Sequence, residues 1–123
     1  MNKLYQLSDL LSELEDHVGY FIDFISTSGI QAGIIRLHPG ENDTQDPHSV
    51  DEVYYVIEGT GFIKLNGKNH AIERGTFIFV HAGTEHKFHG NNQDHVIFYA
   101  LGRKIDVKTV IMLRTCHIDN IYK

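Results

Sequence analysis

The first residues of the chain show an apolar repeat with the period of a helix. Leucines recur at intervals of one, three and four residues between positions 7 and 14, with acidic residues among them. Such spacing places apolar side chains on one face of a helix. The pattern predicts a helix over residues 8–16, with Ser8 as its N-cap and Gly19 as its stop.

From residue 20 to about residue 102, short apolar runs alternate with turns rich in Gly, Asn and Pro. The runs are aromatic and β-branched, which favours strands. Asn66-Gly67 is typical of a two-residue hairpin turn, and residues 38–47 read as a long loop. We expect an antiparallel sandwich or barrel, with strands at residues 20–27, 29–37, 52–59, 76–80, 85–89 and 94–101 and a hairpin at 62–73.

The last residues, 103–123, are apolar but show no clear period, so helix and strand both remain open. We expect a C-terminal arm that packs on the barrel or on a second subunit. The length of 123 residues suits one compact domain. The prediction is therefore a single domain over residues 1–123, with its core at about 20–102.

Composition narrows the classes of partner. The formal net charge is -5, which argues against the basic face that nucleic-acid binding requires. No apolar run approaches the roughly 18 residues of a membrane helix, and the N-terminal residues lack the apolar region of a signal peptide. One cysteine excludes an internal disulfide. We expect a cytoplasmic protein that binds neither nucleic acid nor membrane.

Nine histidines raise the expectation of metal binding, because imidazole is the commonest metal ligand. The stretch DPHSVDEVYYVIEGTG, residues 46–61, carries Asp46, His48 and Glu52 at positions of like parity. In an extended chain such side chains share a face. They form either a solvated surface or half of an ion site.

The spacing around these residues resembles the first motif of the cupin superfamily. That motif is a Gly, five residues, His-x-His, three or four residues, Glu, six residues and Gly. Here Gly40 is followed at the matching positions by Asp46, His48, Glu52 and Gly59. The departure is Asp46, which stands where the first His is expected.

A second stretch, GTFIFVHAGTEHKFHG, resembles the second cupin motif. That motif is a Gly, five residues, Pro-x-Gly, two residues, His, three residues and Asn. Here it reads Gly75, His81, Gly83, His86 and Gly90, with His81 in place of Pro and Gly90 in place of Asn. The resemblance spans at least residues 33–101.

The resemblance implies an all-β fold, the cupin-type double-stranded β-helix, a jelly-roll-like antiparallel barrel, here with a short N-terminal helix. It also implies one divalent transition metal per chain. Carried over by position, His48, Glu52 and His86 are the expected ligands, with Asp46 as a fourth. Two imidazoles with carboxylates favour Fe or Mn, and Zn or Ni stay open.

Parity and neighbouring strands suggest a pocket wall of four side chains, namely Tyr54, Val56, Phe88 and Tyr99. Glu52 and His86 are the expected catalytic residues, and His81 and His89 are either supporting residues or surface histidines. The first hypothesis is a metal-dependent enzyme acting on a small organic molecule, dioxygenase-like, with isomerase or lyase next. The alternatives are a non-enzymatic sugar or metabolite binder and a degenerate site without metal. We also expect a homodimer.

Overall fold

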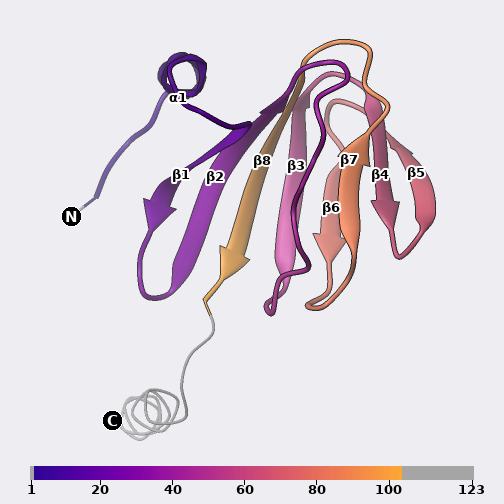
Figure 1. Ribbon diagram of the computed structural model, residues 1–123. Helices are drawn as coiled ribbons and strands as arrows, with labels where there is room; N and C mark the ends of the chain where they lie inside the picture. Colours follow the sequence, from indigo (N-terminus) through magenta and orange to yellow (C-terminus); the bar gives the residue numbers. More distant parts are fainter. Residues whose placement is uncertain (1, 104–123) are drawn as a thin grey trace, which may run out of the picture.

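The computed structural model describes residues 2–103 (Figure 1). The predicted C-terminal arm lies almost wholly outside this range. The described elements, in chain order, are α1 (Leu7–Glu15), β1 (Phe21–Ser26), β2 (Ile30–Leu37), β3 (Glu52–Glu58), β4 (Gly61–Leu65), β5 (Lys68–Ile72), β6 (Phe77–Val80), β7 (His86–His89) and β8 (His95–Gly102). Each predicted strand is present, and so is the long loop before β3.

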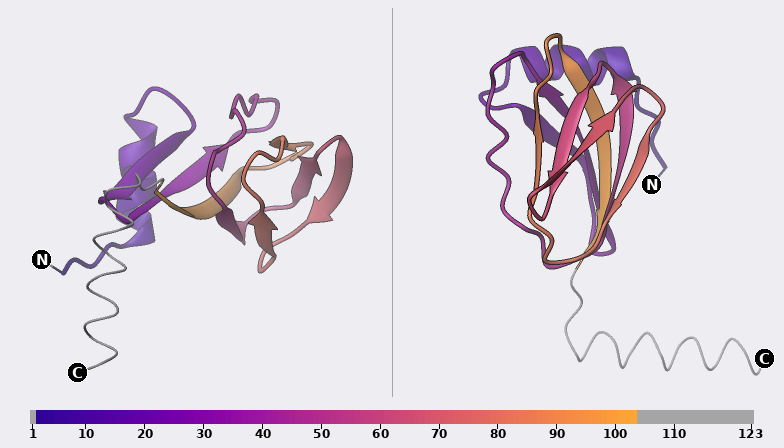
Figure 2. Two further views of the ribbon diagram at one scale, coloured as in Figure 1. Left: turned by 90° about the horizontal axis from the view of Figure 1, so that it is seen from below. Right: turned by 90° about the vertical axis from the view of Figure 1, so that its right-hand side faces the viewer.

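The strands form two antiparallel sheets. The larger sheet has the order β1-β2-β8-β3-β6, and the smaller has the order β5-β4-β7. The two sheets are stacked around a shared core, and in the right-hand view of Figure 2 strands of one sheet pass in front of strands of the other. The prediction of an all-β sandwich of jelly-roll type is confirmed.

The main core lies between the two sheets. Alternate residues of β3 and β8 point inward from the larger sheet, and residues of β4 and β7 meet them. Tyr54, Val56, Phe88 and Ile97 are essentially inaccessible to solvent. Burial of such side chains supplies the main driving force for folding, at about 1.5–3 kcal/mol for each large apolar side chain.

Helix α1 covers one part of the outer face of the larger sheet. Leu10 and Leu14 are buried against Ile22, Ile34 and Val96, so the leucine stripe is core, as predicted. The predicted cap at Ser8 is wrong. The helix begins after Gln6, whose side chain makes no capping hydrogen bond, which shows that burial of the leucines positions this helix without a side-chain cap.

The predicted hairpin turn between β4 and β5 is confirmed. Asn66 has φ of 47° and Gly67 has φ of 83°, the two positive values that a type I′ turn requires. Leu65 pairs with Lys68 directly across this turn. The turn therefore sets the register of β4, which in turn aligns β7 and the residues that β7 carries.

Helix α1, the helix of residues 2–103, lacks the combination of length and apolar character that crossing a bilayer requires.

Candidate metal centre

Three of the predicted ligands converge at one end of the sandwich. His48 lies in the loop before β3, Glu52 is the first residue of β3, and His86 is the first residue of β7. Each offers one ligand atom, and these atoms lie within 4.8 Å of one another. Residues 38 positions apart in the sequence thus meet because β3 and β7 belong to the two facing sheets.

A single carboxylate oxygen lies at the centre of this cluster. Oε1 of Glu52 is 3.5 Å from Nε2 of His48 and 3.4 Å from Nε2 of His86. Both nitrogens are buried, and neither has a hydrogen-bond partner. Buried polar atoms are normally paired. Two unpaired imidazole nitrogens aimed at one carboxylate therefore suit a cation held among them.

The other ring nitrogen of His86 has a partner that orients the imidazole. Nδ1 lies 2.9 Å from the carbonyl oxygen of Thr84. A carbonyl can only accept, so Nδ1 carries the proton and donates it. In the neutral ring, Nε2 is then the unprotonated nitrogen, with its lone pair directed into the cluster. This arrangement of the second ring nitrogen is typical of metal-binding histidines.

Glu52 is held by the hydroxyl of Tyr54, two residues further along β3. The hydroxyl lies 2.7 Å from Oε1 of Glu52 and 3.0 Å from Oε1 of Gln45. A phenol has one proton to donate. Tyr54 donates it to Glu52, because the charged carboxylate is both the nearer and the stronger acceptor. Gln45 is a supporting residue that the sequence motifs do not contain.

Two pKa shifts agree with this geometry. Burial and the negative charge of Glu52 raise the pKa of the Tyr54 phenol, so its hydroxyl keeps its proton and donates it to the carboxylate. Burial acts to lower the pKa of the His86 imidazole, but the adjacent Glu52 carboxylate and Thr84 carbonyl outweigh burial and raise it. Both shifts reflect a carboxylate placed deep in the fold.

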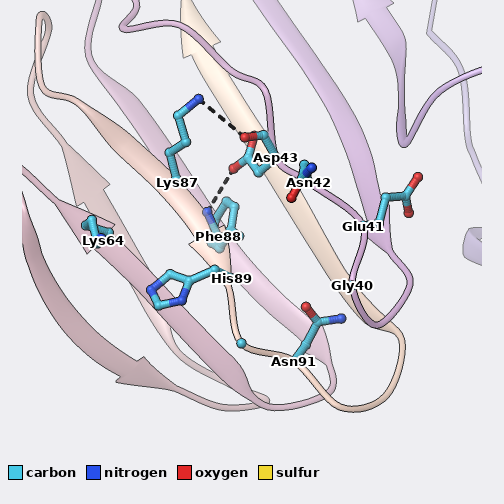
Figure 3. Close-up of a pocket in the computed structure, with 10 residues that line it drawn as sticks. Gly40, Glu41, Asn42, Asp43, Lys64, Lys87, Phe88, His89 and Asn91 are labelled. Carbon is cyan, nitrogen blue, oxygen red and sulfur yellow. Dashed lines mark hydrogen bonds between the residues drawn. The ribbon is translucent and has the colours of Figure 1, made fainter.

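The loop that carries His48 is anchored by a buried carboxylate, Asp43. Its side chain accepts hydrogen bonds from the Tyr20 hydroxyl, the Phe88 backbone N–H and the Gln45 side chain. Figure 3 shows Asp43 beside β7, with Lys87 donating to its backbone carbonyl oxygen. Asp43 thereby ties the loop to the strand that supplies His86.

A cavity of about 430 Å³ lies on the side of Asp43 drawn in Figure 3. Lys64, Lys87 and His89 line it together with Glu41 and Asn42. None of the three converging side chains is among its lining residues. This cavity is therefore separate from the cluster, although Asp43 and Phe88 contribute to both regions.

Two cavities border the cluster. The His48 side chain is 35% exposed, whereas those of Glu52 and His86 are 2% and 1% exposed, and His48 lines a small cavity of about 170 Å³ at the end of the sandwich where β8 ends. His86 lines a larger cavity of about 290 Å³ together with Gln45 and Asp46. A small molecule would reach the cluster past His48 or from the cavity beside His86.

Asp46 lies outside the group of converging ligand atoms, and its side chain is exposed. The parity argument assumed extended chain from Asp46 to Glu52, but residues 38–51 contain no strand. Alternation of side chains holds only in regular strands. In this geometry the neighbouring Gln45, and not Asp46, reaches Tyr54.

The four predicted pocket residues are all buried in the main core. Tyr54 contacts the cluster directly. Phe88 packs edge-on against Tyr54, with ring centroids 4.9 Å apart, and it also lines the larger cavity. The Tyr99 hydroxyl donates to Asp23 and also lies 3.3 Å from the carbonyl oxygen of Ile22. Val56 is core.

Two other histidines named from sequence lie elsewhere. His81 is exposed, with Nδ1 3.9 Å from Asp51, and His89 bonds Asn69 through Nε2 at 2.9 Å. His95, which the sequence analysis did not single out, is fully buried, and both of its ring nitrogens lack a hydrogen-bond partner. The apolar run that follows His95 could have indicated its burial, because alternate residues of such a strand face the core.

Comparisons with known proteins agree with the fold. A family model described as a cupin domain matches residues 33–102. The chain is 33% identical over 92 residues to uncharacterized protein SCO3923 of Streptomyces coelicolor, an overlap of 75% of this chain and 88% of that protein.

A second relative is 5-nitrosalicylic acid 1,2-dioxygenase of Bradyrhizobium sp., 24% identical over 75 residues, which covers 61% of this chain and 36% of that protein. Among solved structures, BH2720 of Bacillus halodurans superimposes with a TM-score of 0.69 at 15% identity, covering 86% of this chain and 84% of that one. The family match covers more than half of the chain and includes His48, Glu52 and His86, so the protein belongs to the cupin family.

Proposed function

We propose that this cupin is a metal-dependent enzyme that acts on a small organic molecule, with a dioxygenase reaction as the first candidate. His48, Glu52 and His86 would hold one divalent transition metal. The observation that carries the proposal is the pair of buried, unpartnered imidazole nitrogens on either side of one carboxylate oxygen.

The donor set indicates which ions would bind. Two imidazoles and one carboxylate form the facial arrangement typical of Fe(II) in oxygenases, and carboxylate oxygen also suits Mn(II). Zn and Ni accept the same ligands. An ion held this way would supply open coordination positions for substrate and dioxygen, or a Lewis acid for an isomerase or lyase.

Neighbouring residues orient the proposed ligands. The Thr84 carbonyl keeps the His86 ring in the tautomer whose Nε2 can bind an ion. The Tyr54 hydroxyl holds the Glu52 carboxylate in place. Tyr54 and Phe88 pack behind the ligands and exclude water from that side, so reactants would approach past His48 or from the cavity beside His86.

The relative named for a dioxygenase supports the first candidate reaction, although the match covers 36% of that protein. The name of that relative specifies a nitrated salicylic acid as its substrate. For this chain, the proposed substrate class is a small organic molecule that can offer oxygen atoms to a metal. Isomerase and lyase reactions need the same ligands and no dioxygen.

Elemental analysis of the protein purified without added metal tests the first part of the proposal. We expect close to one Fe or Mn per chain, and loss of the metal in the His48→Ala, His86→Ala double variant. The matched control is His81→Ala, because His81 is exposed and lies outside the cluster. A wild-type protein that takes up no ion from excess divalent salts would overturn the metal site.

Oxygen uptake tests the second part. The metal-loaded protein should consume dioxygen with at least one member of a panel of catechols, thiols and keto acids, and the double variant should not. A loaded protein without uptake would exclude a dioxygenase acting on these classes. Saturable ligand binding that His86→Ala leaves intact would support a non-enzymatic binding module instead.

A further inference from the structure

The outer face of the larger sheet is only partly covered within the described residues. Helix α1 covers the part over β1, β2 and β8, where Ile34 and Val96 are buried. On the other part, over β3 and β6, Val53, Phe77 and Phe79 are exposed by 42%, 74% and 54%. We call Val53, Tyr55, Phe77 and Phe79 the β3–β6 face.

These side chains form one continuous apolar surface. Val53 pairs with Phe79 and Tyr55 pairs with Phe77 across the two strands. The Tyr55 and Phe77 rings have centroids 4.6 Å apart. Contiguous exposed apolar surface rimmed by polar groups marks an interaction site more often than isolated apolar residues do.

The position of β6 strengthens this conclusion. It is the last strand of the larger sheet in residues 2–103, and its sequence FIFV contains neither a charge nor a proline. Proteins usually protect an exposed edge strand with lysine, proline, a bulge or a covering segment. The first two are absent from β6, and a covering segment would also bury Phe77 and Phe79.

We propose that residues 104–123 of the same chain cover the β3–β6 face. This segment follows Arg103, directly after β8, and β8 is separated from β6 by β3 alone. The distance across two strand spacings is about 10 Å. Twenty residues span up to about 66 Å when extended and about 30 Å as a helix, so the segment is long enough in either conformation.

The segment also begins at the correct end of the sheet. Glu52 of β3 lies opposite both Leu101 of β8 and Val80 of β6. The chain therefore leaves β8 level with the end of β6, and a return along the sheet would bring it over Phe79 and then Phe77. The segment therefore need not cross the end of the sandwich to reach the β3–β6 face.

The composition of the segment matches the surface. Its aliphatic residues are Ile105, Val107, Val110, Ile111, Met112, Leu113, Ile118 and Ile121. It carries four basic and two acidic side chains, a formal +2, whereas residues 1–103 carry seven basic and 14 acidic side chains, a formal -7. Apolar contact and opposite charge both favour association of the segment with the rest of the chain.

The single cysteine, Cys116, lies in this segment, so a nitroxide label can be attached to the native sequence. We expect paramagnetic broadening of the backbone amide signals of Val53, Phe77 and Phe79, reversed when the nitroxide is reduced. Signals of β5, in the other sheet, should keep their intensity. A second label position, Lys108→Cys in a Cys116→Ser background, repeats the test should a label at position 116 disturb the contact.

A mixture of differently labelled chains distinguishes binding of residues 104–123 within one chain from binding by a second copy of the chain. An isotope-labelled Cys116→Ser chain is mixed with excess spin-labelled chain of natural isotope abundance. Covering within one chain predicts no broadening in this mixture. Broadening of the β3–β6 face in the mixture would mean that a second copy occupies it, and an absence of broadening in both experiments would mean that the segment does not bind there. Either result overturns the proposal.

Variants on each side of the contact complete the test. Phe77→Ser with Phe79→Ser, and separately Ile111→Asp with Leu113→Asp, should abolish the broadening. Phe62→Ser is the matched control, because Phe62 is 40% exposed on the smaller sheet, and this change should leave the broadening intact. The variant in residues 104–123 leaves the sandwich unaltered, so persistent broadening in that variant would also contradict the proposal.

Discussion

The hydroxyl of Tyr54 lies 2.7 Å from Oε1 of Glu52, the same oxygen that the imidazoles of His48 and His86 face. One strand thus supplies both a candidate ligand and the group that orients it. Tyr54 and Glu52 are two residues apart, so the pleat of β3 places both on the inner face. The contact is therefore a direct consequence of strand geometry.

Tyr54→Phe should weaken metal binding without removing it. Loss of an outer hydrogen bond to a ligand typically lowers metal affinity by about 10–100-fold. The ring still fills the core, but the buried Glu52 carboxylate loses its donor, and an unpaired buried acceptor costs about 1–3 kcal/mol. Competition with a chelator measures the affinity. Tyr55→Phe, on the same strand but the opposite face, is the control and should bind metal as wild type does.

Asp46→Ala should leave metal affinity nearly unchanged, because the Asp46 side chain is exposed and lies outside the converging group. His48→Ala, two residues away in the same loop, should lower affinity by more than the roughly 100-fold expected for an outer-shell change. The same chelator competition compares the two variants. Equal losses in both would show that Asp46 is a ligand of the bound ion, as the motif position suggested.

His95 should make the protein less stable as the pH falls. Burial lowers the pKa of the His95 imidazole, so below the unfolded-state value of about 6.5 the unfolded chain binds a proton that the folded chain does not. Stability is then lost with decreasing pH, by at most about 1.4 kcal/mol per pH unit for one proton.

Urea unfolding between about pH 5.5 and 7.5, the range in which an unperturbed histidine titrates, measures this dependence. His95→Leu should reduce the slope of unfolding free energy against pH, whatever its effect on absolute stability. His70→Leu, at an exposed position on β5, should not change the slope. An unchanged slope in His95→Leu would mean that the imidazole finds a partner or solvent when protonated.

Gly33→Ala should destabilise the fold. Gly33 pairs with Tyr99 across β2 and β8, and an added Cβ would overlap the Tyr99 hydroxyl and the Ile22 carbonyl oxygen. Overpacking of this kind costs about 1–3 kcal/mol, which corresponds to a decrease in Tm of about 4–8 °C per kcal/mol in a domain of this size. Thermal unfolding followed by circular dichroism measures the change.

Gly29→Ala is the matched control for Gly33→Ala, because a Cβ at Gly29 meets nothing within 4 Å. It should leave Tm unchanged or raise it slightly, since alanine restricts the unfolded chain. A double variant, Gly33→Ala with Tyr99→Phe, should recover only part of the loss, because the Ile22 carbonyl oxygen and the Cζ carbon of the ring at position 99 still obstruct the methyl group. Full recovery would show that the hydroxyl alone causes the strain.

Much of the fold was accessible from local sequence. Aromatic and β-branched runs bounded by turn residues predicted each strand, and Asn66-Gly67 predicted a turn with two positive φ values. These features depend on near neighbours in the chain, whose geometry is set by the backbone. The motif spacing likewise selected His48, Glu52 and His86, which the structure brings together.

Only the tertiary structure showed which other residues contact or support the cluster of His48, Glu52 and His86. Gln45 reaches Tyr54 and Asp46 does not, because residues 38–51 are irregular and the anchor at Asp43 sets their path. Parity has no meaning in such a loop. His95 became a buried, unpartnered imidazole because Gly59 and Gly61 of a neighbouring segment leave room for its ring.

The same distinction applies to the outer face of the larger sheet. Alternation along β6 placed Phe77 and Phe79 on one side of the strand, but nothing local indicated that helix α1 would cover only β1, β2 and β8. Local spacing determines which side chains share a face. The order of strands and the contact between layers determine what each face meets, and these depend on residues far apart in the chain.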